Sequence, residues 1–183
     1  MWYKLSGFGD EISPDFDTQL KVLKEEGIDY LELRSAFGKN VVNLDDEDID
    51  AIQKFLDKYG IKISAIASPI GKVRAREDIE GQKEKLGNAI KLAHIFNTPY
   101  IRIFSFYPEE DMSIEELRKI SLERLGELVR IAEKEGAILL HENEKRIYGD
   151  IPERCLDILK SINSPNLKAV FDPSNFIQCN VKP

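Results

Sequence analysis

The sequence predicts an α/β protein in which helices cover a parallel β-sheet. Short apolar runs alternate with longer amphipathic segments five times, and a sixth apolar run follows. This alternation is typical of a parallel sheet, because each connection between parallel strands crosses the sheet face as a helix. Nearly every apolar run also ends in a polar or charged residue. Polar groups at many strand ends favour a barrel, whose strand-to-helix loops converge on one mouth.

The first third of the chain predicts two strands and a helix. Residues 3–9 form the first strand, and a Ser-Pro-Asp run at 13–15 starts the helix. A hydroxyl N-cap, a proline that needs no N–H donor and an acid in the first turn all favour a helix N-terminus. Apolar residues then recur at helical spacing until Gly27, which ends the helix. Residues 28–33 form the second strand.

The middle of the chain repeats this pattern. The acidic residues 45–48 favour the start of a second helix, which Gly60 ends. Residues 61–67 are the third strand, and a third helix is expected over about 77–96 with its apolar residues on one side. Residues 99–104 then form the fourth strand.

The C-terminal part predicts two more helices and two more strands. A capping box at residues 113–116 opens the fourth helix. The fifth strand spans residues 137–142, and acidic residues at 150–153 favour the start of the fifth helix. The sixth strand spans residues 167–172, whereas residues 173–183 show no clear element.

Six parallel strands fit either a doubly wound sheet or part of a barrel. Residues 7–12 lack the third glycine of a dinucleotide fingerprint, and the sequence contains no P-loop. A closed barrel needs eight strands and typically about 250 residues. We therefore expect one TIM-barrel-like domain over residues 1–183, incomplete with six parallel strands and five helices. Its first and last strands would be open edges through which the chain could form homo-oligomers.

Composition limits the partners and the location. The 183 residues are 42% hydrophobic, which suffices for one buried core. We expect a cytoplasmic protein without a membrane partner, because no apolar run approaches the roughly 18–20 residues of a membrane span. The net charge of −7 argues against nucleic-acid binding, which needs a basic face. The two cysteines, Cys155 and Cys179, lack metal or redox spacing.

Two strand ends carry the predicted site. Glu142 ends the fifth strand and Asp172 ends the sixth. The carboxyl ends of parallel strands meet on one face, so these acids predict a metal-binding carboxylate pair. Alternatively, each acid could pair with Arg102 or another nearby base and simply close the barrel mouth. His141 precedes Glu142, so strand alternation directs it toward the helix layer.

Two motifs resemble those of a known family. Residues 141–144, His-Glu-Asn-Glu, and residues 171–176, Phe-Asp-Pro-Ser-Asn-Phe, are similar to motifs of the sugar-phosphate isomerase/epimerase family. Its members are xylose-isomerase-like TIM barrels related to AP endonucleases. Residues 30–34 and 68–72 give weaker support. The resemblance spans almost the whole chain, but only six of the family's eight βα units.

The resemblance implies a metal-dependent isomerase or epimerase of a small-molecule sugar or sugar phosphate. One divalent ion (Mn²⁺, Mg²⁺, Co²⁺ or Zn²⁺) would be bound by Glu142 and Asp172, with a histidine and a second glutamate expected beyond residue 183. Glu142 would also be a catalytic residue that moves a proton beside a carbonyl. Asn175 lies where many relatives have a histidine near the substrate.

The expected substrate contacts are Glu32, Ser68, Arg102 and Asn175, although Glu32 could instead pair with Arg34. Two other functions remain open. The same fold serves AP-endonuclease-like, metal-dependent hydrolases, which the acidic composition disfavours. The chain could also be a non-catalytic partial barrel that self-associates through its open edges.

Overall fold

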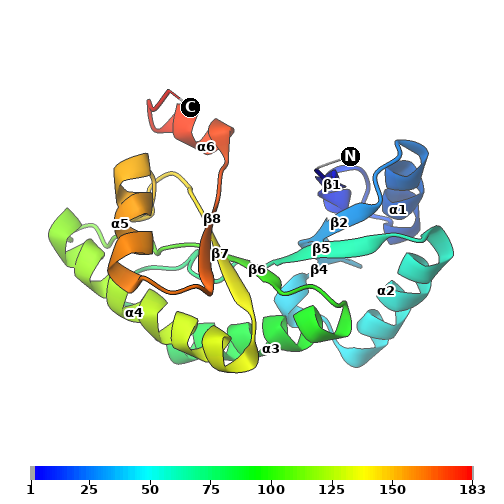
Figure 1. Ribbon diagram of the computed structural model, residues 1–183, viewed down its shortest axis with the longest axis horizontal. Helices are drawn as coiled ribbons and strands as arrows, with labels where there is room; N and C mark the ends of the chain where they lie inside the picture. The colour runs from blue at the N-terminus through cyan, green and yellow to red at the C-terminus, as the bar shows by residue number, and fades with distance from the viewer. Residues whose placement is uncertain (1–2, 183) are drawn as a thin grey trace.

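The computed structural model describes residues 3–182 and consists, in that range, of a six-stranded parallel sheet, six α-helices and a short hairpin (Figure 1). The sheet strands are β1 (Ser6–Gly7), β2 (Tyr30–Leu33), β5 (Lys62–Ala67), β6 (Tyr100–Ile103), β7 (Ile138–Glu142) and β8 (Leu167–Val170). The helices are α1 (Phe16–Glu25), α2 (Asp46–Tyr59), α3 (Glu80–Ile95), α4 (Ile114–Glu135), α5 (Pro152–Ile162) and α6 (Pro173–Gln178). The hairpin joins β3 (Ser35–Ala36) to β4 (Lys39–Asn40).

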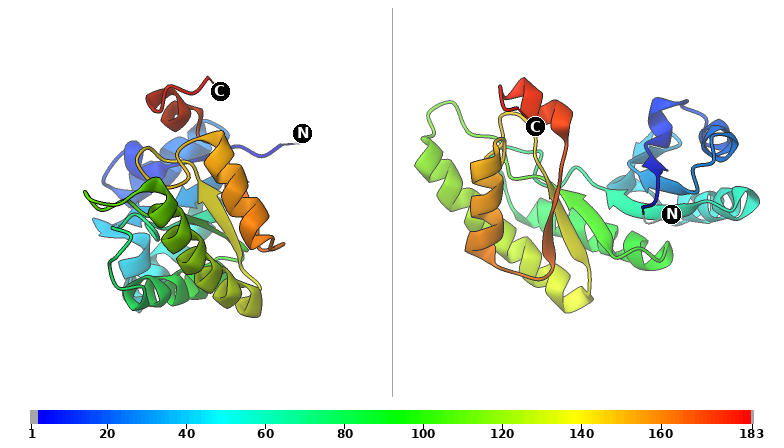
Figure 2. Two further views of the ribbon diagram at one scale, coloured as in Figure 1. Left: turned by 90° about the vertical axis from the view of Figure 1, so that its left-hand side faces the viewer. Right: turned by 45° about the horizontal axis from the view of Figure 1, so that its top comes forward.

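The strand order identifies the architecture. The sheet runs β1-β2-β5-β6-β7-β8, so each strand lies beside its predecessor and the order never reverses. A doubly wound sheet would reverse at a switch point. The helices α1–α5 follow one side of the curved sheet, which is the arrangement of a barrel wall (Figures 1 and 2). The prediction of an incomplete TIM-barrel-like fold with six parallel strands is therefore confirmed.

The core lies between the sheet and the helix layer. Each of the five outer helices contributes at least one side chain with no exposed surface, and so do four of the sheet strands. These residues are Leu20, Ile52, Leu86, Leu125 and Ile158 from the helices and Leu33, Ile66, Ile101 and Leu139 from the strands. Side chains alternate along a strand, so when these residues face the helices the residues between them face the concave side of the sheet. Glu32, Arg102 and Glu142 belong to that second set.

Helix boundaries differ from prediction where a cap was misassigned. The first helix begins at Phe16 with Asp15 as its N-cap, which accepts the Thr18 N–H at 2.9 Å. Ser13 instead accepts the N–H of Asp15 at 3.1 Å and so shapes the preceding turn. At α4, Ser113 accepts the Glu116 N–H as expected. The reciprocal half of that capping box is replaced by an ion pair between Glu116 and Arg76.

The expectation of five helices and no element after residue 172 is wrong. Asp172 is the N-cap of a sixth helix, α6, and accepts the Asn175 N–H through Oδ1 at 3.0 Å. Pro173 occupies the first helical position, where no N–H donor is needed. Among residues 3–182, no helix is long and apolar enough to cross a membrane.

Candidate functional site

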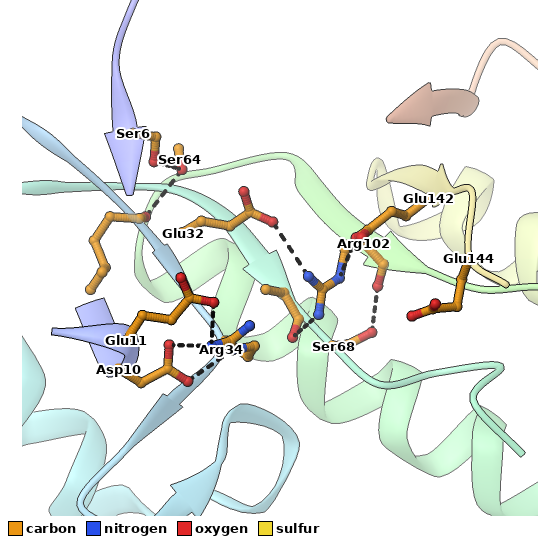
Figure 3. A network of polar contacts seen from close by, with 12 residues as sticks. Ser6, Asp10, Glu11, Glu32, Arg34, Ser64, Ser68, Arg102, Glu142 and Glu144 are labelled. Carbon is orange, nitrogen blue, oxygen red and sulfur yellow. Dashed lines mark hydrogen bonds and ion pairs between the residues drawn. The ribbon is translucent and has the colours of Figure 1, made fainter. Parts of the chain in front are cut away.

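Three charged side chains from three strands meet on the concave side of the sheet (Figure 3). Arg102 from β6 lies between Glu32 from β2 and Glu142 from β7. Its Nη1 is 3.9 Å from Glu32 Oε1, and its Nε is 3.2 Å from Glu142 Oε2. The parallel register sets Arg102 beside Leu140, two residues before Glu142. On β7, the alternation that buries Leu139 and His141 turns Glu142 to the concave side of the sheet. The same alternation on β2 and β6 turns the other acid and the base to that side.

The guanidinium of Arg102 is held from several directions. Its side chain is only 8% exposed, and Nη2 donates to the carbonyl of Ala67 at 3.2 Å. The ring centroids of Phe8 and Phe104 lie 5.6 and 5.0 Å from the guanidinium carbon. The Nε–H, however, is not aligned with an acceptor anywhere in residues 3–182, so its contact with Glu142 is an ion pair without a hydrogen bond. The Nε atom is itself fully buried, so this donor is unsatisfied inside the fold, next to Glu142.

The two acids beside Arg102 hold their protons more tightly than ordinary carboxyl groups. Burial is the main cause of the raised pKa of Glu142, opposed by the charges of Arg102 and Lys72 and reinforced by Asp172. The pKa of Glu32 is also raised, chiefly by burial, and Glu142 contributes to the rise. Raised carboxyl pKa values in one cluster are typical of groups that take up and release protons.

Asp172 is positioned by a side chain that imitates a peptide group. Asn143 donates from Nδ2 to the Asp172 carbonyl and accepts the Asp172 N–H at Oδ1, both at 2.8 Å. These bonds extend the β7–β8 pairing beyond Val170. Asn175 completes the bridge by donating from Nδ2 to the Asn143 carbonyl at 2.9 Å. In this structure, the amide of the predicted substrate contact Asn175 therefore ties α6 to the loop after β7.

Ser68 and His141 lie behind the cluster. Ser68 is fully buried, and its hydroxyl donates to the Arg102 carbonyl at 2.5 Å, which places it as a support for that strand. The His141 ring is also buried, with Nε2 2.9 Å from Ser105 Oγ. Burial lowers the pKa of His141 to about 4, so the ring is neutral at neutral pH. Ser105 Oγ also accepts the N–H of Gly149, which anchors the loop after β7.

Two ion pairs at the rim were not predicted. Arg34 does not pair with Glu32; its Nε and Nη2 instead donate to the two carboxylate oxygens of Asp10, each at 2.9 Å. The register of β1 against β2 brings these groups together, and sequence spacing alone does not reveal it. Lys72 pairs with Glu144 at 2.7 Å and lies over the Phe104 ring at 4.3 Å. The first pair ties neighbouring segments after β1 and β2 together, and the second ties the loop after β5 to the loop after β7.

The residues available for a metal ion are two carboxylates. Glu142 and Asp172 lie close enough for the charge of Asp172 to raise the pKa of Glu142. Oxygen donors of this kind suit a hard divalent cation, but such ions take about four to eight ligands. No group of three or more His, Cys, Asp or Glu residues that could hold a metal occurs in the described part of the chain. The two acids therefore fit such an ion as part of a ligand set.

Comparisons with known proteins identify the family and the fold. A family model described as "xylose isomerase-like TIM barrel" matches residues 20–180. No curated protein sequence matches significantly.

Three solved structures illustrate the likeness. The IOLI protein with a bound zinc atom is 22% identical, with a TM-score of 0.78 over 98% of this chain and 66% of that one. The probable 3-DHS dehydratase AsbF from Bacillus anthracis is 21% identical, with a TM-score of 0.76 over 99% and 66%. A D-tagatose 3-epimerase-like protein is 22% identical, with a TM-score of 0.74 over 96% and 66%. The chain thus spans slightly less than two thirds of each.

Proposed function

The chain belongs to the xylose isomerase-like TIM barrel family, and from that premise we propose that it contributes the catalytic face of a metal-dependent isomerase or epimerase acting on a sugar or sugar phosphate. The observation that carries the proposal is the group formed by Glu142, Arg102 and Glu32. It combines two carboxyl groups of raised pKa with a buried cation that has an unfilled donor. This combination supports proton transfer next to a carbonyl.

The proposed chemistry assigns a separate task to each side chain. Glu142 takes the proton from the carbon beside the substrate carbonyl, because its raised pKa brings it closer to a base that works near neutrality. The positive charge of Arg102, beside Glu142, stabilises the negative charge that develops on the substrate oxygen, and burial strengthens that interaction. Glu32, on the other side of Arg102, hydrogen-bonds a substrate hydroxyl. The rings of Phe8 and Phe104 limit access of water to the guanidinium.

A divalent ion would be held in part by Glu142 and Asp172. When bound, such an ion acts as a Lewis acid on the carbonyl oxygen. The bound zinc of the IOLI protein supports a divalent ion, although carboxylate ligands alone do not select among Mn²⁺, Mg²⁺, Co²⁺ and Zn²⁺. Asn143 positions Asp172 for this role through its two backbone bonds.

Solvent deuterium exchange tests the proposal directly. The chain is incubated in D₂O with Mn²⁺ and a panel of ketoses and ketose phosphates, and label at the carbon beside the carbonyl is measured by NMR. Glu142→Gln should lose roughly 100- to 10,000-fold in exchange rate while its circular dichroism spectrum stays unchanged. Glu84→Gln is the matched control, because Glu84 is exposed and lies on α3. Exchange that is equally fast in the Glu142→Gln variant, or absent for every sugar in the wild type, would refute the assignment.

A further inference from the structure

A cavity, here called the rim cavity, lies outside the Glu32–Arg102–Glu142 group. It has a volume of about 730 Å³ and lies between the loops that follow β6 and β7, beside the first turn of α4. None of the three residues of that group lines it. Part of its wall is apolar, formed by Met112, Ile114, Leu117 and Ile147. Ile114 is 42% exposed, so a hydrophobic surface is open to a ligand there.

Three cations line this cavity without a carboxylate partner. Arg74, Lys145 and Arg146 all contribute to the lining. Within residues 3–182, no acidic group forms a salt bridge with any of them. Arg74 donates to the Pro108 carbonyl, and Lys145 donates to Gln178 Oε1 at 2.6 Å. Although the whole protein carries a net charge of −7, these three cations make this part of its surface basic.

The two acids in the lining are already neutralised by other bases. Glu144 pairs with Lys72 at 2.7 Å, and Asp150 pairs with Arg154, whose Nε donates to it at 2.8 Å. Neither Lys72 nor Arg154 lines the cavity. The lining of the cavity therefore has a net positive charge, which attracts an anion.

The loop that carries Arg146 is fixed by its buried neighbours. Ile147 and Tyr148, the next two residues, are 1% and 3% exposed. The Tyr148 N–H donates to the carbonyls of Ser105 and Phe106, and its hydroxyl donates to Asp157 Oδ2 at 2.6 Å. The exposed Arg146 side chain therefore extends from a fixed backbone, which lowers the ordering cost of binding compared with a cation on a mobile loop.

We propose that this rim cavity binds a small organic anion, a phosphate or carboxylate attached to a compact apolar body. The oxyanion lies between Arg74 and Arg146, whose guanidinium groups suit the oxygens of either head group. The apolar body packs against Met112 and Ile114. This site does not depend on the chemistry proposed for Glu142, and either assignment can fail without the other.

Binding of phenyl phosphate and benzoate tests the site. Titrations followed by NMR should give saturable binding of at least one of them, with shifts of the Met112 and Ile114 methyl signals. Benzyl alcohol, which has the body without the charge, and inorganic phosphate, which has the charge without the body, should bind at least about tenfold more weakly. Arg74→Gln and Arg146→Gln should each weaken binding by about tenfold, because each removes charge-assisted hydrogen bonds.

Two further variants locate the effect. Arg130→Gln removes an exposed arginine from a different surface of α4 and should bind as the wild type does. Glu142→Gln should also retain full binding, which separates this cavity from the proposed catalytic site. The proposal is overturned if neither anion binds below about 10 mM, if benzyl alcohol binds equally well, or if both arginine variants keep wild-type affinity.

Discussion

The buried ring of His141 should make the protein lose stability in mild acid. Burial lowers its pKa to about 4 in the folded chain, against 6.5 for an ordinary histidine. Below pH 6.5 the unfolded chain therefore binds a proton that the folded chain does not. The stability that depends on the neutral His141 ring is fully present above pH 6.5 and is lost as the pH falls toward 4. Linkage between these two pKa values gives a loss of about 2 kcal/mol in the free energy of unfolding between pH 7.5 and pH 5.

Urea denaturation of wild type and His141→Gln at these two pH values measures this loss. Glutamine cannot be protonated, so the variant should lose about 2 kcal/mol less than the wild type between the two conditions. The comparison is a difference of differences, so any packing cost of the substitution cancels. His94→Gln is the control, because the His94 ring lies at the surface with its Nε2 3.1 Å from the Glu135 carbonyl oxygen. Equal losses in the wild type and His141→Gln would refute the reasoning.

Two further substitutions test the supports of the site. Asn143→Ala removes both bonds to the backbone of Asp172, so it should lower the free energy of unfolding by about 1–3 kcal/mol, measured by urea denaturation, and weaken Mn²⁺ binding, measured by calorimetry. Asn88→Ala loses one bond of 3.3 Å and should lower the free energy of unfolding by less. Equal losses in the two variants would contradict the role given to Asn143. Gly71→Ala places a methyl group against a backbone carbonyl at φ +84° and should cost more than about 2 kcal/mol. Gly38→Ala, at φ +75° in open space, should show only the backbone cost of about 1–2 kcal/mol, and a Gly71→Ala cost no larger than this would refute the predicted overlap.

The fold class was predictable because it depends on local patterns. Apolar runs of strand length, helix caps and terminal glycines recur in a fixed alternation, and each is visible within a few residues. The sixth helix was missed although its signal, an acidic N-cap followed by proline at Asp172 and Pro173, is present. With six residues, α6 is too short to show an apolar period.

The site was predictable only as a set of strand ends. Sequence placed Glu32, Arg102 and Glu142 at one face, but the partner of each charge depends on register. The sequence allowed a pair between Arg34 and Glu32, but in the structure the register of β1 against β2 places Asp10 2.9 Å from Arg34 instead. The rim cavity was not predictable, because its cations come from loops more than 70 positions apart in the chain.

The uninterrupted strand order also determines how stability is shared along the chain. Each βα unit packs mainly on the units before and after it, so the fold resembles a linear array whose members support their immediate neighbours. Pairing of adjacent strands joins residues that are far apart in sequence, such as Ser6 with Tyr30 and Tyr100 with Ile138, so each parallel pairing forms slowly. Damage to β1 and damage to β8 should add independently, since no direct pairing joins them. The Glu32–Arg102–Glu142 group lies across the middle units and so in the part of the array least exposed to fraying ends.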